Sequence, residues 1–178
     1  MTVLDIIKKR QSVREYQDRP VEEEKLKLIL EAARLAPSSS NSQPWHFIAV
    51  KDRGLKKELV RAVPLGAAAI NKFIENSPVI IVGCVMPNFF QKVTALFGRE
   101  NHIIDVSIAM EHMVLEAEEL GLSTCWIGWF DEGKVKKLLT VPKTAKVVAM
   151  LALGYSKEGG THATTRKALE EIYSVDKY

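Results

Sequence analysis

A run of eight residues without a charge, VIIVGCVM at positions 79–86, places the strongest constraint on how this chain can fold. Its β-branched and other apolar residues follow one another without the polar alternation of a half-exposed strand. Continuous runs of this kind are typical of strands that are buried on both faces. We therefore expect a sheet with this segment as a central strand, covered by other elements on each side.

Helical and extended patterns alternate through the rest of the chain. Leu26, Ile29 and Ala33 fall on one face of a helix that ends before Pro37. Residues 103–120 are apolar around much of a helix circumference, which indicates a helix packed on several sides. Helices mixed with about four strands indicate an α+β or α/β domain of three layers, and the strand order stays open. The remaining strands are expected at 45–50, 123–129 and 146–154, and the remaining helices at 4–10, 54–62, 67–75 and between Asp131 and Pro142.

Composition narrows the class of protein. The 178 residues are a single-domain length, 47% of them are apolar, and 25 basic against 22 acidic residues leave a net charge of +3. This charge is too small to indicate a nucleic acid partner by itself. Cys84 and Cys125 lie in apolar runs and are expected to be buried free thiols. Because no membrane span and no signal-peptide pattern is found, we expect a cytoplasmic protein.

Several common catalytic motifs are missing from the sequence. There is no glycine-rich dinucleotide fingerprint and no phosphate-binding loop that ends in Gly-Lys-Ser/Thr, and residues 121–125 lack the second glycine of a hydrolase elbow. The four histidines lack zinc-site spacing, and His102 with Asp105 is expected to be a solvated pair at a helix start. These observations favour an enzyme whose reactive atom belongs to a cofactor, or a protein without catalysis.

Three segments carry a positive signal. In an extended chain, Arg10, Ser12 and Arg14 lie on one side and suit a phosphate, although a basic helix end in a solvated turn has the same sequence. The segment 37–45, PSSSNSQPW, can present hydroxyls and amides to the polar edge of a planar ring, or can be an ordinary polar loop. In GLSTCWIG at 121–128 a helix ends and a strand begins, and its last glycine permits close approach of a ligand.

Taken in order, these segments resemble the FMN-dependent nitroreductase family. The matching pieces are Arg-x-Ser-x-Arg, Ala-Pro-Ser-Ser, Asn-x-Gln-Pro-Trp, Gly-Leu-x-Thr-Cys-Trp-Ile-Gly and a late Arg-Lys, and they extend from about Ile6 to Ile172. The resemblance implies one FMN-binding domain over residues 1–178. It also implies an α+β three-layer fold, with a central mixed sheet flanked by helices, in an intertwined homodimer.

The resemblance further implies a set of cofactor-binding residues. Arg10, Ser12 and Arg14 would bind the FMN phosphate with help from Arg166, and Gln11 belongs to the same cofactor-binding segment. Lys72 would lie next to the pyrimidine edge of the ring. The backbone around Trp126, Ile127 and Gly128 would face the N5 and O4 side. The loop from the other subunit would contribute Pro37, Ser38, Ser39, Asn41 and Gln43.

The implied activity is an NAD(P)H-dependent oxidoreductase that acts by a ping-pong route. NADH or NADPH would give hydride to flavin N5, and a small aromatic acceptor such as a nitroaromatic or a quinone would then take it, so that no side chain is needed as a catalytic group and no metal is involved. A reductase for another acceptor, such as a dehalogenase or an enoate-type enzyme, and a non-catalytic flavin-binding module are the alternatives. No nucleic acid and no membrane partner is expected. Residues 87–101 are expected to be the substrate-facing part. Phe89, Phe90 and Phe97 can line a pocket there, although packing in the core or at the dimer interface fits them equally.

Overall fold

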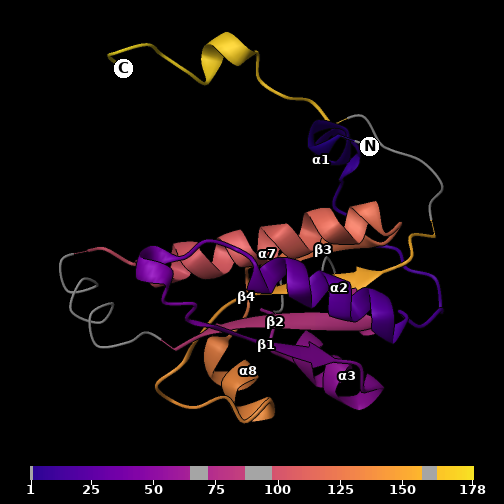
Figure 1. Ribbon diagram of the computed structural model, residues 1–178. Coiled ribbons are helices and arrows are strands. Elements are labelled where there is room, and N and C mark those ends of the chain that lie inside the picture. Colours follow the sequence, from indigo (N-terminus) through magenta and orange to yellow (C-terminus); the bar gives the residue numbers. More distant parts are fainter. Residues whose placement is uncertain (1, 65–71, 87–97, 158–163) are drawn as a thin grey trace.

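The structure of the protein is a computed structural model that describes residues 2–64, 72–86, 98–157 and 164–178 (Figure 1). Four strands form one sheet, with helices on both of its faces. The helices and short 3-10 turns are α1 (Val3–Lys9), α2 (Glu23–Arg34), η1 (Ser39–Asn41), α3 (Arg53–Arg61), α5 (Phe73–Asn76), α7 (Asn101–Glu119), α8 (Glu132–Leu138) and η2 (Leu169–Glu171). The strands are β1 (Trp45–Val50), β2 (Val79–Val85), β3 (Ser123–Ile127) and β4 (Lys146–Gly154).

The sheet has the strand order β1-β2-β4-β3, and all three ladders between these strands are antiparallel. The mixed sheet that the resemblance implied is therefore found only at the outer edge. There, Ser12 forms a single parallel bridge with Thr124 of β3. The segment that contains Ser12 is too irregular to extend the sheet as a further strand, because it pairs at isolated points.

Strand β2 separates two hydrophobic cores, as the uncharged run predicted. Ile80, Val82 and Cys84 face one core, which α3, α5 and α8 cover. Val79, Ile81 and Val85 face the other, which α2 and α7 cover. Alternate residues of a strand point to opposite faces, so both sets are buried only because helices lie on each side. Figure 1 shows the resulting three layers.

The helix boundaries follow local sequence signals. Thr2 accepts a hydrogen bond from the Asp5 backbone N–H, and the Asp5 side chain accepts one from the Thr2 N–H, which forms a capping box at the start of α1. Asp131 caps α8, as expected, by accepting from the Lys134 N–H at 3.0 Å. The expected helix at 67–75 is described only from Lys72, where α5 follows, and the rest of that prediction lies outside the described residues.

Tyr155, which follows β4, connects the end of this strand to the start of α2. Its buried hydroxyl donates to Glu22 Oε2 at 2.6 Å and accepts from Lys25 Nζ at 3.0 Å. The Arg19 guanidinium lies 3.8 Å from the centre of the Tyr155 ring. The Tyr155 hydroxyl is the largest cause that lowers the pKa of Glu22 from its ordinary 4.5 to about 2, and the Arg19 side chain adds to this effect.

Tyr155→Phe should therefore lower the melting temperature in a pH-dependent way. Because the pKa of Glu22 is depressed in the folded protein, the interaction stabilises the fold above about pH 4.5 and is lost as the pH falls toward about 2. Thermal melts of wild type and variant should differ most near neutral pH and converge in acid. Tyr173→Phe, at an exposed position, serves as the control. A difference that does not change with pH would contradict this role of Glu22.

None of the helices in the described residues is long and apolar enough to cross a membrane.

Candidate functional site

The segment 10–14 is extended and lies along the edge strand β3. The Val13 N–H donates to the Thr124 carbonyl at 2.9 Å, next to the bridge between Ser12 and Thr124. Val13 is buried in the core, whereas Ser12 and Arg14 are exposed on the opposite side. The alternation predicted from the sequence is thus present from Ser12 to Arg14, and it directs the hydroxyl and the guanidinium away from the core.

Arg14, Ser12 and Arg10 all affect the pKa of one buried group, the thiol of Cys125 in β3. Burial raises the pKa of this thiol, while the Arg14 charge, a hydrogen bond from Ser12 and the Arg10 charge act in the opposite direction. All three side chains therefore lie within interaction range of Cys125. Two guanidiniums and a hydroxyl on one short segment are a donor set that suits a phosphate.

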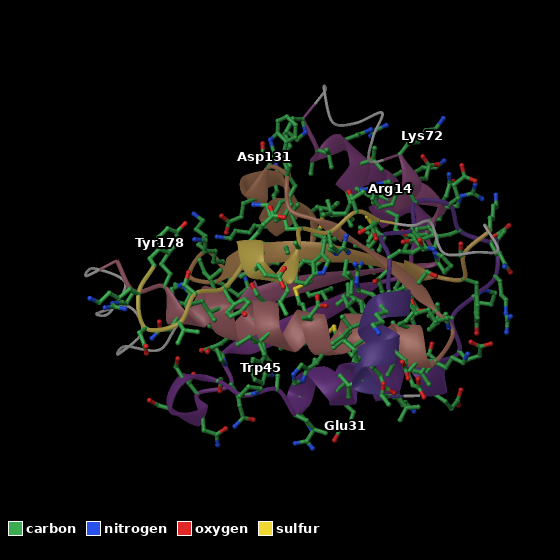
Figure 2. All side chains as sticks on the ribbon, turned by 90° about the horizontal axis from the view of Figure 1, so that it is seen from above. Arg14, Glu31, Trp45, Lys72, Asp131 and Tyr178 are labelled. Carbon is green, nitrogen blue, oxygen red and sulfur yellow. The ribbon has the colours of Figure 1, made fainter. Side chains whose placement is uncertain are left out.

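Arg14 shares a cavity with Lys72, although the two are remote in sequence. The cavity has a volume of about 370 Å³. Figure 2 shows that the two labelled side chains come from the same part of the molecule. The lining also includes Lys157 and one acidic residue, Glu15, so that its basic side chains outnumber its acidic ones. This excess of positive charge favours an anionic ligand. The full lining is Arg14, Glu15, Tyr16, Lys72, Phe73, Asn76 and Lys157.

The helix that begins after Lys72 is fixed by a buried lysine of α3. Lys56 Nζ donates to the Ser77 carbonyl at 2.6 Å and to the Pro78 carbonyl at 3.1 Å, just past the end of α5. Burial lowers the pKa of Lys56, and the nearby Arg53 lowers it further. A larger cavity of about 550 Å³ adjoins this region and shares Tyr16, Asn76 and Lys157 with the smaller one. None of the predicted cofactor-binding residues lines the larger cavity.

The carboxyl end of β3 provides exposed backbone. The strand ends at Ile127, whose side chain is buried, and Gly128 follows it at the surface. No heavy atom lies within 4 Å of the point where a Cβ of Gly128 would stand. The Trp126 side chain is half-buried on the face of the sheet that α2 and α7 cover. A flat ligand can therefore approach the backbone at Gly128 closely.

The serine-rich loop is a tight 3-10 turn that hydrogen bonds to itself. Ser38 Oγ accepts from the Gln43 N–H at 2.9 Å, and Gln43 Nε2 donates to Asn41 Oδ1 at 3.1 Å. The loop leads directly through Pro44 into β1. Asn41 and Gln43 are exposed, as is Pro37. The polar groups expected in this loop are thus presented to its surroundings rather than to the core.

Within one chain, this loop does not meet the Arg14 group. The loop contacts α7 near Asp105, in its second turn, whereas Thr124, which bridges Ser12, follows shortly after the other end of α7. From Asp105 to Glu119 the helix rises by roughly 20 Å. Figure 2 agrees, since Trp45, which follows the loop, lies well apart from Arg14. The serine-rich loop and the Arg14 group are thus separate on one chain.

His102 and Asp105 are not the solvated pair that the sequence suggested. Both side chains are buried, at 5% and 3% exposure. Asp105 Oδ1 accepts from the Ser39 N–H at 3.0 Å, so the loop covers Asp105. Charged residues at a helix start are normally exposed, and only the packing of a remote loop reverses this, so the sequence pattern gave no signal for it.

Arg166 lies in a tail that leaves the body of the chain. Its Nη1 donates to the carbonyl of Thr165 at 2.9 Å, and it lines neither of the two cavities above. All residues from 164 to 178 are exposed. Figure 1 shows this tail and α1 outside the layer formed by α2 and α7. The structure of a single chain does not bring Arg166 to a site.

Two further expectations concern metals and substrate. Among residues 2–64, 72–86, 98–157 and 164–178, no group of three or more histidine, cysteine or acidic side chains could hold a metal ion. Cys84 and Cys125 are free and buried, as predicted. Of the segment 87–101, which was expected to face the substrate, residues 87–97 lie outside the described part of the chain.

Comparison with known proteins shows which family this chain resembles. Residues 7–155 match the model of the nitroreductase family. A protein of Archaeoglobus fulgidus, provisionally named an NADH dehydrogenase/NAD(P)H nitroreductase, is 33% identical over 159 residues, which are 87% of this chain and 86% of that protein.

Two solved structures have the same fold. A nitroreductase family protein from Clostridium novyi is 37% identical with a TM-score of 0.82, and the match covers 89% of this chain and 87% of the other. An FMN-dependent nitroreductase from Clostridium difficile is 30% identical with a TM-score of 0.83, and the match covers 98% and 99%. From the family match and the α+β fold together, this chain belongs to the nitroreductase family.

Proposed function

We propose that this protein binds FMN and acts as an NAD(P)H-dependent oxidoreductase toward a small aromatic electron acceptor. The observation that carries the proposal is the cavity shared by Arg14 and Lys72, two cations from separate segments, next to the Ser12–Thr124 bridge. The names of the relatives point the same way, since one gives FMN and another gives NAD(P)H.

The residues present fit FMN. Arg10, Ser12 and Arg14 offer the charged donors that a phosphate needs, and Gln11 belongs to the same segment. Lys72 would lie at the pyrimidine edge of the ring, and the backbone from Trp126 to Gly128 would face its N5 side, where the open space at Gly128 supports close approach. When bound, FMN would supply the redox chemistry by carrying hydride between the nicotinamide and the acceptor.

The charges of this chain support that chemistry. Lys72 would stabilise negative charge that develops on the pyrimidine edge, because the cavity that it shares with Arg14 has an excess of positive charge. Burial keeps the thiol of Cys125 protonated at neutral pH, since its pKa is raised. This thiol therefore does not add a negative charge beside the proposed phosphate site. Binding, orientation and electrostatics are the contributions of the protein.

We further propose that the site is completed in a homodimer. The serine-rich loop, with Pro37, Ser38, Ser39, Asn41 and Gln43, would reach the FMN held by the second subunit, because it lies at the far end of α7 from Arg14. Large apolar side chains on α1 and on the exposed tail support such a dimer, since exposed apolar patches mark interfaces. They are Val3, Leu4, Ile7, Leu169, Ile172, Tyr173 and Val175. In that assembly the tail could carry Arg166 to a phosphate.

The proposal includes one functional domain over residues 1–178 and a cytoplasmic location. Two free, buried cysteines support a reducing compartment. Reduced nicotinamide cofactors are available there.

A panel of acceptors tests the activity. The FMN-loaded protein is given saturating NADH or NADPH together with a nitroaromatic, a quinone, a halogenated aromatic or an activated alkene. We expect the nitroaromatic and the quinone to be reduced fastest. Turnover of only the halogenated compound or the alkene would instead indicate a dehalogenase or enoate-type reductase. Bound FMN that neither nicotinamide reduces would contradict catalysis.

Gly128→Ala should weaken FMN binding roughly fivefold, the factor that corresponds to about 1 kcal/mol. No heavy atom of the chain would meet the added methyl group within 4 Å, so thermal stability should be retained. The methyl group would instead occupy the space in which the backbone is proposed to face the ring. Gly133→Ala in α8 is the matched control, and both are measured by FMN titration. Equal affinity in the two variants would exclude Gly128 from contact with the flavin.

A further inference from the structure

The serine-rich loop has an unusual backbone. Ser40, Asn41 and Gln43 all adopt left-handed conformations, with φ of 53°, 52° and 43°. Residues other than glycine rarely take this conformation, because the Cβ atom crowds the backbone. Three such residues within four positions persist only where surrounding contacts hold them, and strained segments of this kind concentrate at functional sites.

One buried carboxylate connects this loop to the rigid part of the fold. Asp105 is 3% exposed, and its Oδ1 accepts the Ser39 N–H at 3.0 Å. Ser39 is the first residue of η1, and Ser38 and Gln43 close the loop across its base with a hydrogen bond of 2.9 Å. Asp105 belongs to the nineteen-residue helix α7, which packs against three strands of the sheet. The position of the loop is thus tied to a helix that packs against the sheet.

A second observation comes from the preceding turn of the same helix. His102 is 5% exposed, and its Nδ1 has no hydrogen-bond partner. It is the single buried side-chain atom of this kind in the part of the chain that the structure describes. Because buried polar atoms are almost always paired, His102 Nδ1 marks the start of α7 as a second polar position beside the Asp105 anchor.

We propose that Asp105 is a positioning residue, which holds the strained loop in the conformation that contacts the FMN bound by the partner subunit. The inference rests on the proposed function. Asp105 does not touch the flavin in this account, and it acts through the Ser39 N–H. A carboxylate suits this task, since a charged acceptor binds a backbone N–H more strongly than a neutral one does. The trans arrangement follows from the separation of the loop and Arg14 along α7.

Asp105→Leu and Asp105→Asn test the anchor itself. Leucine removes the acceptor, whereas asparagine retains an oxygen for the Ser39 N–H. Without FMN, amide hydrogen exchange of residues 38–43 should be faster in the leucine variant and closer to wild type in the asparagine variant. FMN affinity should fall at least roughly tenfold with leucine and should be partly retained with asparagine. Unchanged exchange and affinity in Asp105→Leu would overturn the proposal.

A mixed dimer tests whether the loop serves the other subunit. Chains carrying Arg14→Ala and chains carrying Asp105→Leu are given different affinity tags, co-expressed, and purified as the mixed species in two steps. If each loop acts on the site of its partner, both substitutions fall in one site and the other site is intact. The mixed dimer should then bind one FMN with wild-type affinity. If the loop acts within its own chain, neither site is intact and no such binding is seen, which would overturn the proposal.

FMN binding by the wild-type protein distinguishes a failure of this inference from a failure of the proposed function. Wild type that binds no FMN would overturn both. Wild type that binds FMN, with exchange and affinity unchanged in Asp105→Leu, would overturn the inference alone. Should Asp105→Leu fail to fold, Ser39→Pro removes the same hydrogen bond from the donor side. Ser38 is extended, with φ of −146° and ψ of 155°, and therefore accommodates a following proline. The same mixed-dimer outcomes then apply.

Discussion

Replacing Arg14 by alanine should weaken FMN binding roughly ten- to a hundredfold. Arg14 lies in an extended segment beside β3 and lines the cavity that Lys72 also lines. A charge-assisted hydrogen bond contributes about 1.5–3 kcal/mol, which gives this range. Because Arg14 is exposed on the single chain, the substitution should leave the hydrophobic core intact.

Fluorescence titration of the purified variant with FMN measures this effect. Arg61→Ala is a matched control, since Arg61 is an exposed arginine of α3 that pairs with Glu58 and lines no part of the proposed site. The control should bind FMN as wild type does. A dissociation constant that is unchanged in Arg14→Ala would remove Arg14 from the site and would leave the cavity without its assigned role.

Gly154→Ala should destabilise the protein by about 1–3 kcal/mol. A Cβ at Gly154 would stand in hard contact with Cδ of Pro78, 2.8 Å from Cγ of Pro78 and 3.0 Å from Cδ1 of Tyr16. The proline ring is rigid, and Tyr16 is buried with its hydroxyl bonded to the Val13 carbonyl at 2.7 Å. Neither neighbour can move without displacing the segment that leads to Arg14.

Thermal or denaturant unfolding measures this loss, and each 1 kcal/mol lowers the melting temperature by about 2–4 °C in a chain of this size. Gly83→Ala is an instructive comparison. Its Cβ would meet Sδ of Met110, a flexible side chain that can change rotamer, so the loss should be smaller. Equal stability of Gly154→Ala and wild type would show that β4 and the Pro78 turn are less tightly packed than described.

Local patterns in the sequence sufficed for most elements of the fold. The strand limits at 45–50 and 146–154 were predicted as they are found, because both are apolar runs bounded by clear turn signals. The long helix and the two-sided burial of β2 also followed from periodicity. The order and direction of the strands could not be predicted from local patterns, because hydrogen-bonded pairing joins residues that are remote in sequence.

The candidate site was likewise predicted only in part from the sequence. Residue types and their order suggested Arg10, Ser12 and Arg14, and the family resemblance suggested Lys72. The cavity brings Arg14 and Lys72 together. The burial of Asp105 was missed, because it arises from a loop more than sixty residues earlier in the chain, and the hydrogen bond to Ser39 has no local signature. The left-handed backbone of that loop was equally hidden, since serine, asparagine and glutamine occur there in place of glycine.

The visible spectrum of the purified protein shows directly whether FMN binds and carries hydride. The protein is mixed with FMN, freed of excess cofactor and then given NADH or NADPH without oxygen. Retained flavin absorption that the nicotinamide bleaches, and that a nitroaromatic or quinone then restores, is the predicted result. A protein that retains no flavin from an FMN solution would contradict the account.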